Sequence, residues 1–220
     1  MLNDCHTGLR TRGFTLLEVL IAILITAFGL LGLAGLMSKM QLAETEGYAR
    51  SQAQALLTYM VERVQDDVRP PTYTAGVYDY TNYLADVNAF TNSGGTVTVG
   101  TAGTGVTSYT SPCTGSGPAF DLCEWNFALQ GAAETRSSTQ VGAMSGARGC
   151  VTLVSAANTA TGTCHPATVR VTVVWQGLVN GADQSSDANT CAADLYGLKT
   201  AGQRRIVAQQ ITVGIPRCTN

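Results

Sequence analysis

Charged residues are scarce in this 220-residue chain. They make up 13% of the sequence, and the formal net charge is −2 at pH 7. Arg204 and Arg205 form the only adjacent basic pair, and no Lys or Arg lies between Arg69 and Arg136. Nucleic-acid binding depends on clustered positive charge. We therefore expect no nucleic acid as a partner.

Histidine is also rare, because only His6 and His165 occur. His165 follows Cys164 directly, but catalytic Cys and His side chains must meet through the fold and not merely along the sequence. We interpret His165 as a loop residue before Pro166. No catalytic residue and no cofactor is assigned, and we predict that the protein is not an enzyme.

The sequence lacks any CxxC pair, although it has seven cysteines. If Cys5 is removed with an N-terminal leader, an even number remains, which is typical of a disulfide framework and not of a zinc site. The simplest pairing joins neighbours in sequence, and the alternative is a set of buried free thiols. The neighbour pairing predicts the disulfides Cys113–Cys123, Cys150–Cys164 and Cys191–Cys218.

A long apolar run covers residues 14–37 and contains a single charged residue, Glu18. About 20 apolar residues suffice to cross a bilayer, and the run is too long for the apolar region of a signal peptide. Arg10 and Arg12 precede it, so the positive-inside rule places the N-terminus in the cytoplasm. The run is predicted to span the membrane.

Glu18 lies four residues into this run, where a carboxylate is costly. Such a residue is functional by default. The alternative is a side chain that reaches back to the lipid headgroups. Residues 12–18, RGFTLLE, decide between the two hypotheses because they combine a basic residue, a Gly-Phe junction and a glutamate at fixed spacing.

This segment resembles the processing site of type IV pilins and their relatives. The resemblance implies that a prepilin peptidase cleaves after Gly13, which makes residues 1–13 a leader and Phe14 the N-methylated first residue. It also implies that Glu18 pairs with the α-amine of a neighbouring subunit during assembly. A buried carboxylate is tolerated when a cation meets it in low dielectric.

The helical pattern continues through residues 38–69, where apolar residues recur every three or four positions. Pro70 and Pro71 end it. We expect one helix from about Thr15 to Val68, whose second half packs an apolar stripe against a globular head. The alternative is a transmembrane helix followed by an amphipathic linker.

Residues 70–220 are predicted to form the head. Aromatic side chains between residues 73 and 90 are expected to anchor a long loop, and the Gly/Thr/Ser-rich segment 91–119 is expected to be mobile. Residues 120–130 predict a short helix with Asp121 at or near its N-cap. We interpret Asp121 and Glu124 as capping residues, not as a catalytic carboxylate pair.

Three strands are expected at residues 150–154, 169–176 and 205–215, because alternating β-branched residues favour a half-buried antiparallel sheet. A long helix on such a sheet is an α+β fold, the pilin-like architecture. The order of the amphipathic helix, the DLCEWNFALQ segment and the RVTVVWQG strand is similar to the PilV family of minor pilins, the type IV pilus modification proteins.

The resemblance implies a minor pilin that acts in pilus initiation or at the tip, with effects on adhesion and twitching motility. Its expected partners are other minor and major pilins, the prepilin peptidase and the inner-membrane assembly platform. The precursor is expected in the inner membrane, and the processed subunit in a filament that crosses the periplasm to the cell exterior.

Two alternatives remain open. One is a pseudopilin of a type II secretion system. The other is a ligand-binding or adhesin module for sugar, DNA or calcium, with Asp183, Asp187 and Asp194 as possible oxygen ligands. These residues do not form an EF-hand, and a solvated loop is the commoner arrangement, so we assign no metal.

Overall fold

The computed structural model divides the chain into two compact units, Met1–Thr45 and Glu46–Asn220. The predicted leader, apart from Gly13, lies outside the described residues. The structure describes residues 13–132, 135–136, 139–140, 144–160, 163–178, 180, 189–193, 195–196 and 202–214.

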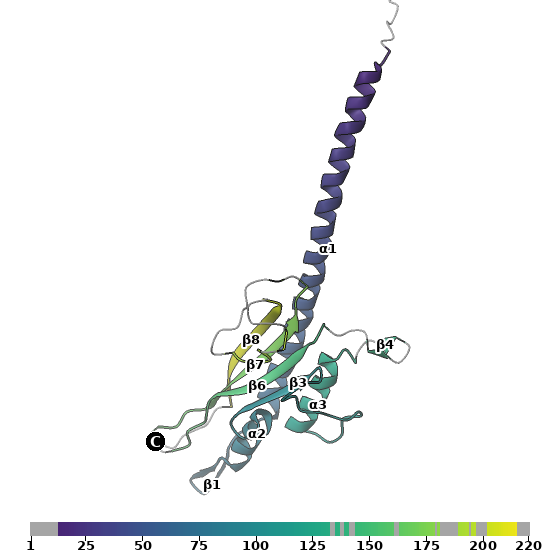
Figure 1. Ribbon diagram of the computed structural model, residues 1–220. Helices are drawn as coiled ribbons and strands as arrows, with labels where there is room; N and C mark the ends of the chain where they lie inside the picture. Colours follow the sequence, from purple (N-terminus) through teal and green to yellow (C-terminus); the bar gives the residue numbers. More distant parts are fainter. Residues whose placement is uncertain are drawn as a thin grey trace, which may run out of the picture. The chain divides into compact units, whose positions relative to one another are not determined.

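Helix α1 comprises Leu16–Asp67, 52 residues, and is drawn from purple to blue in Figure 1. At 1.5 Å per residue it is about 78 Å long. The hydroxyl of Thr15 accepts a hydrogen bond from the Glu18 N–H at 3.3 Å, as an N-cap does. The helix ends three residues before Pro70, so its predicted bounds are confirmed to within one residue.

A four-stranded antiparallel sheet forms the centre of the second unit, in the order β3-β6-β7-β8. Its strands are β3 (Thr96–Gly100), β6 (Arg148–Ser155), β7 (Ala167–Gln176) and β8 (Arg204–Val213). The last three confirm the predicted strands. Two further two-stranded sheets are small: β1 (Thr72–Thr74) with β2 (Val77–Asp79), and β4 (Thr135–Arg136) with β5 (Thr139–Gln140).

Strand β3 corrects the prediction that residues 91–119 are mobile. Val97 and Val99 are buried on the core side, and β3 pairs with β6 along its full length. The alternating pattern of β3 is only five residues long and lies between glycines. The strand was not predicted because the residues around it are rich in Gly, Thr and Ser. Its stability comes from pairing with β6, which is distant in sequence.

Two short helices complete the head. Helix α2 (Thr81–Thr91) occupies part of the region predicted as a loop, and its aromatic residues Tyr83 and Phe90 are buried. Helix α3 (Pro118–Leu129) begins at a proline, with Gly117 as its N-cap. The short helix predicted at residues 120–130 is confirmed, but Asp121 is not its N-cap and makes no capping hydrogen bond. Asp121 lies in the first turn, near the N-cap, where an acidic residue complements the helix dipole.

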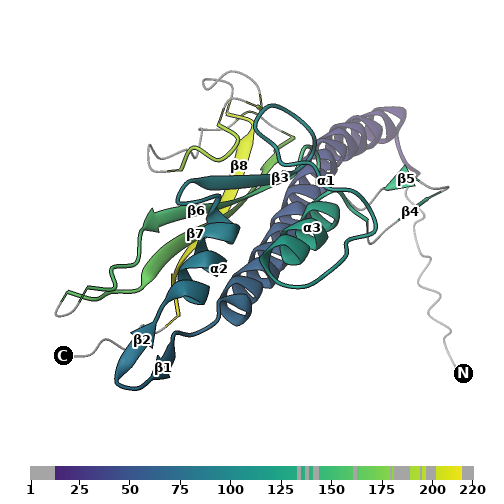
Figure 2. The ribbon, with the colours of Figure 1, turned by 90° about the horizontal axis from the view of Figure 1, so that it is seen from below.

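The main core joins α1, α2, α3 and the four-stranded sheet. Helix α1 contributes the predicted stripe of Ala53, Leu57, Met60, Val61 and Val64, and α2, α3 and the sheet contribute the rest. Figure 2 shows α3 beside α1 on one side of the sheet. The structure confirms the α+β fold with a long N-terminal helix packed on an antiparallel sheet.

Candidate functional site

The predicted processing residues lie just before α1. Gly13 and Phe14 have no regular secondary structure, and the Phe14 side chain is 82% exposed. A Cβ placed on Gly13 would meet no atom within 4 Å. Gly13 and Phe14 are therefore both exposed in the part of the chain that the structure describes.

Glu18 is the third residue of α1, four positions after Phe14. Its side chain is exposed, and its neighbours Leu17 and Val19 are also exposed. A carboxylate in the first turn interacts favourably with the helix dipole. In an apolar environment, however, it needs a cation beside it. Cleavage after Gly13 would create one, the α-amine of Phe14.

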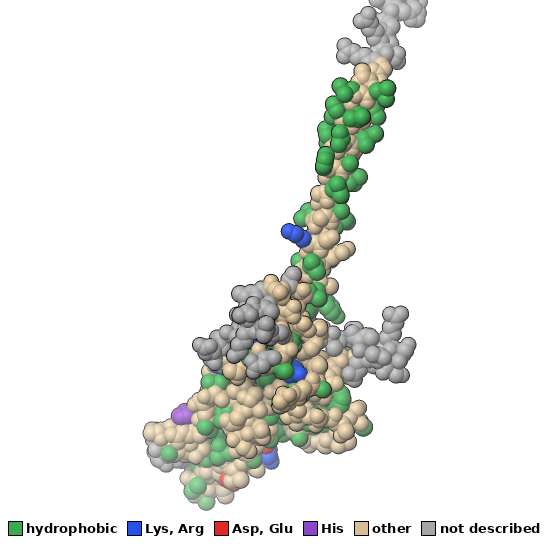
Figure 3. All heavy atoms as spheres, viewed as in Figure 1, with side chains coloured by type: hydrophobic (Ala, Val, Ile, Leu, Met, Phe, Trp, Pro, Cys, Tyr) green, Lys and Arg blue, Asp and Glu red, His purple; other side chains and the backbone are tan. Residues whose placement is uncertain are grey.

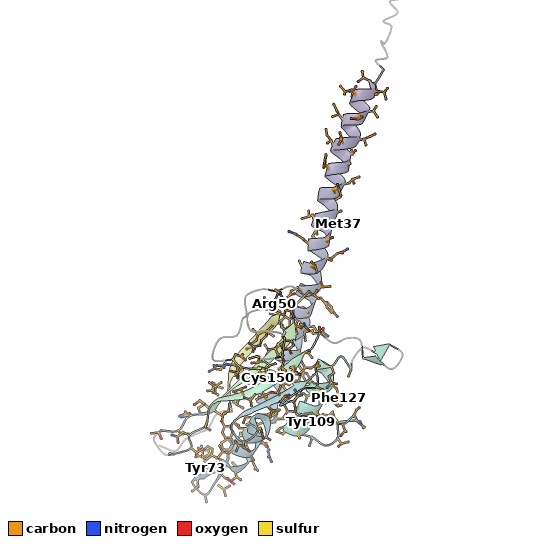
Figure 4. All side chains as sticks on the ribbon, in the orientation of Figure 1. Met37, Arg50, Tyr73, Tyr109, Phe127 and Cys150 are labelled. Atoms are coloured by element: carbon orange, nitrogen blue, oxygen red, sulfur yellow. A yellow bond between two sulfur atoms is a disulfide. The ribbon has the colours of Figure 1, made fainter. Side chains whose placement is uncertain are left out.

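The surface around this segment is apolar on all sides of the helix. Hydrophobic side chains lie along the N-terminal half of α1 in Figure 3, and side chains project from both sides of this helix near Met37 in Figure 4. The most apolar window of this helix has a mean hydropathy of 2.6, and none of it is buried. By length and composition, α1 is the one described helix that could cross a membrane.

Residues 9–34 match the family model of the prokaryotic N-terminal methylation motif. The matched segment contains Gly13, Phe14 and Glu18, and it supports the resemblance to the type IV pilin superfamily. Together with the apolar helix, it fits a precursor anchored in a membrane by its N-terminus. No curated protein and no solved structure matched the chain.

Arg204 and Arg205 of the head make structural contacts that could not be predicted from the sequence. Arg205 on β8 donates from Nε to Oε1 of Glu46 on α1 at 2.5 Å, and both side chains are largely buried. The buried Arg204 donates to the backbone oxygens of Asn189 and Cys191. Arg205 thus links β8 to α1, and Arg204 links β8 to the loop that precedes it. The one signal in the sequence was the charge of Glu46, which lies off the apolar stripe of the helix and indicates a polar partner.

Another ion pair fixes the end of α1. Arg69 donates two side-chain hydrogen bonds to Asp86 on α2, at 2.8 and 2.7 Å, and its N–H donates a third. The side-chain hydrogen bonds from Arg69 lower the pKa of Asp86 below its usual value. The pair spans 17 residues, so no local pattern in the sequence predicts it.

The disulfides agree with the predicted pairing at one position only. Cys113–Cys123 is present, but Cys150 pairs with Cys191, so the predictions Cys150–Cys164 and Cys191–Cys218 are wrong. Cys164 is disulfide-bonded as well, and Cys218 lies outside the described residues.

Strand geometry explains why Cys150 cannot reach Cys164. Cys150 pairs with Thr172 inside the β6–β7 hairpin, whereas Cys164 lies beyond Ser155 and next to the Asn158–His165 bridge. Eight extended residues from Cys150 to Asn158 span about 26 Å, and a disulfide needs Cα atoms within about 7 Å. His165 lies in this hairpin connection, as its predicted loop position implies.

The structure offers little chemistry for a metal. Within the described part of the chain, no group of three His, Cys, Asp or Glu side chains could hold one. The candidates Asp183, Asp187 and Asp194 lie outside the described residues. A cavity of about 480 Å³ between α2 and α3 is lined by uncharged residues, among them Asn88, Asn92 and Tyr109.

Proposed function

We propose that this chain is a minor pilin of a type IV pilus, similar to the PilV family. The prepilin peptidase removes residues 1–13, Phe14 becomes the methylated N-terminus, and the processed subunit joins an initiation or tip complex with other minor and major pilins. In this proposal the protein is a structural subunit with no catalytic role, and it influences adhesion and twitching motility.

The observation that carries the proposal is the combination of an accessible Gly13–Phe14 junction with Glu18 one helical turn later, on a helix whose first half is apolar all round. A buried salt bridge between Glu18 and the α-amine of a neighbouring subunit would neutralise both charges. Loss of either partner would leave the other as an unpaired buried charge, which is destabilising. The α+β head supports the proposal independently.

The test uses two variants in a strain that lacks its own copy of the gene. Gly13→Ala should leave full-length precursor in the inner membrane. Glu18→Ala should still be cleaved but should decrease in sheared filaments by on the order of tenfold or more, since an unpaired buried charge costs several kcal/mol. Mass spectrometry of the sheared fraction reports cleavage, N-methylation and incorporation together.

Glu44→Ala is the matched control, because Glu44 is also an exposed glutamate on α1. It should be cleaved and incorporated like the wild type. Recovery of the Glu18 variant in filaments at the wild-type level would refute the assembly role.

The same experiment separates the pilus from the alternative secretion system. A pilus subunit should be present in sheared pili and absent from them when the pilus assembly platform is deleted. A processed chain that never enters pili, and whose loss blocks protein secretion, would identify a pseudopilin instead.

A further inference from the structure

A buried carboxyl group lies where α3 meets α1. Asp121, in the first turn of α3, has a side chain that is only 2% exposed. Its Oδ1 lies 3.8 Å from Nε of Arg63 on α1, which is at the outer limit of an ion pair. Its Oδ2 is buried and has no hydrogen-bond partner. A carboxylate in this position is poorly compensated.

A second carboxyl group interacts with Asp121. Asp67, the last residue of α1, lies within hydrogen-bonding reach of Asp121. Two carboxyl groups can form a hydrogen bond only when one of them carries a proton. The last turn of α1, where Asp67 lies, has no basic residue.

The other charges around the pair do not neutralise it. Arg63 is half-exposed and also contacts Tyr59, while Glu124 on α3 adds a further negative charge. On the α2 side, Arg69 is engaged by Asp86, and on β6 Arg148 donates to the carbonyls of residues 101 and 102. Burial first, and then the carboxyl of Asp67, raise the pKa of Asp121 to about 7.

We propose that Asp67 and Asp121 share one proton and form a pH-sensitive latch that holds the first turn of α3 against the end of α1. The latch is closed when one of the two carboxyl groups is protonated and opens when both are ionised, because two adjacent carboxylates repel each other. It is independent of the proposed pilus function.

The direction of the pH effect follows from proton linkage. The folded protein holds a proton on Asp121 that the unfolded chain, with an ordinary aspartate pKa near 4, has already lost. The stabilisation is complete below about pH 4 and is lost as the pH rises through about 7. The latch is therefore open in mildly alkaline surroundings and closed in acidic ones.

A second contact limits how far α3 moves when the latch opens. Trp125 is fully buried and donates from Nε1 to the carbonyl of Leu56 on α1 at 3.0 Å, a hydrogen bond that does not titrate. The opening is therefore confined to the first turn of α3 and to the loop that the Cys113–Cys123 disulfide ties to it.

The test compares thermal melting of the full-length chain in detergent micelles from pH 5 to pH 8. The wild type should lose at least about 3 °C over this range. Asp121→Asn should remove that slope and melt above the wild type at pH 8. Asp66→Asn is the control, since Asp66 is exposed in the same turn of α1 as Asp67, and it should keep the wild-type slope.

Two further measurements keep the test decisive if Asp121→Asn folds poorly. Asp67→Asn, which removes the repelling partner, should also flatten the slope. Carboxyl ¹³C NMR of the wild type should show one aspartate that titrates near pH 7, and hydrogen exchange in the first turn of α3 should accelerate above that pH while Trp125 stays protected.

Three results would overturn the latch. The first is a wild type whose melting temperature is flat from pH 5 to pH 8. The second is an Asp121 carboxyl that titrates near pH 4. The third is stabilisation of the wild type, but not of Asp121→Asn, by millimolar calcium at pH 8, which would make the pair a cation site instead.

Discussion

Gly149 on β6 shows how one residue controls the packing of α3. A Cβ placed on Gly149 would lie 2.3 Å from the Trp125 ring. The indole lies against Gly149 on β6 and donates its N–H to the carbonyl of Leu56 on α1. Only glycine leaves room for this contact, so the helix, the tryptophan and the glycine depend on one another.

Gly149→Ala should therefore destabilise the head by about 2–3 kcal/mol, as overpacking of a rigid core does. Gly95→Ala is the matched control, because its Cβ would meet the nearest atom at an ordinary 3.7 Å. Urea unfolding followed by tryptophan fluorescence measures both. Equal stability of the two variants would show that Trp125 is not held rigidly over the sheet.

The N-terminal methylation motif could be recognised from the sequence because it is local. Gly13, Phe14 and Glu18 lie within six positions, and the segment is recognisable without any tertiary contact. Tyr83 is the opposite case. Its hydroxyl donates to the carbonyl of Val213 and accepts from the N–H of Ala167, which lie 130 and 84 residues away. No pattern around residue 83 indicates this role.

Among the elements, the loop before β8 depends on a disulfide that sequence proximity did not predict. Cys150 lies on the sheet face opposite α1, and Cys191 closes over it in a small cluster with Val174 and Tyr196. Asn189 adds a hydrogen bond to Thr172 on β7. The disulfide thus pins the segment around residue 191 onto the second face of the sheet.

Replacing Cys150 and Cys191 together by alanine should cost about 3–4 kcal/mol, since the bond closes a loop with a sequence separation of 41 residues. The same change at Cys113 and Cys123, with a separation of 10, is the comparison and should cost about 2–3 kcal/mol. Urea unfolding ranks the two pairs. A smaller loss at Cys150–Cys191 would contradict the loop-closure argument.

The elements that were predicted correctly are those with long, regular patterns. Helices α1 and α3 and strands β6, β7 and β8 were all predicted, and each is at least eight residues long. Helix α2 and strand β3 are short, and both lie among Gly, Asn and Thr. Their stability comes from Tyr83, Phe90, Val97 and Val99 packing into the shared core, which local propensity does not report.

At the scale of the whole molecule, α1 changes character along its length. Residues from Leu16 to Met40 expose their apolar side chains, whereas buried positions begin at Ala53. The boundary between the two compact units falls between Thr45 and Glu46. Every buried residue of the main core therefore belongs to the second unit.

A fragment of residues 46–220, exported to the periplasm so that its disulfides form, should fold as a soluble head. Its melting temperature should lie within about 3 °C of the full-length chain in detergent. A fragment of residues 66–220 is the control, because it lacks the stripe from Ala53 to Val64, and it should not melt cooperatively. A longer fragment that fails to fold would show that the first unit stabilises the head.

The sequence by itself determined the features of the N-terminal segment. These are an apolar run at residues 14–37, one carboxylate inside it and a glycine–phenylalanine junction at its start. These features act through composition and spacing, which a sequence displays directly. Only the tertiary structure decided that Cys150 pairs with Cys191, that Arg205 binds Glu46, and that Asp121 interacts with Asp67. Those contacts join residues between 41 and 159 positions apart, and their energies exist only once the core has brought the elements together.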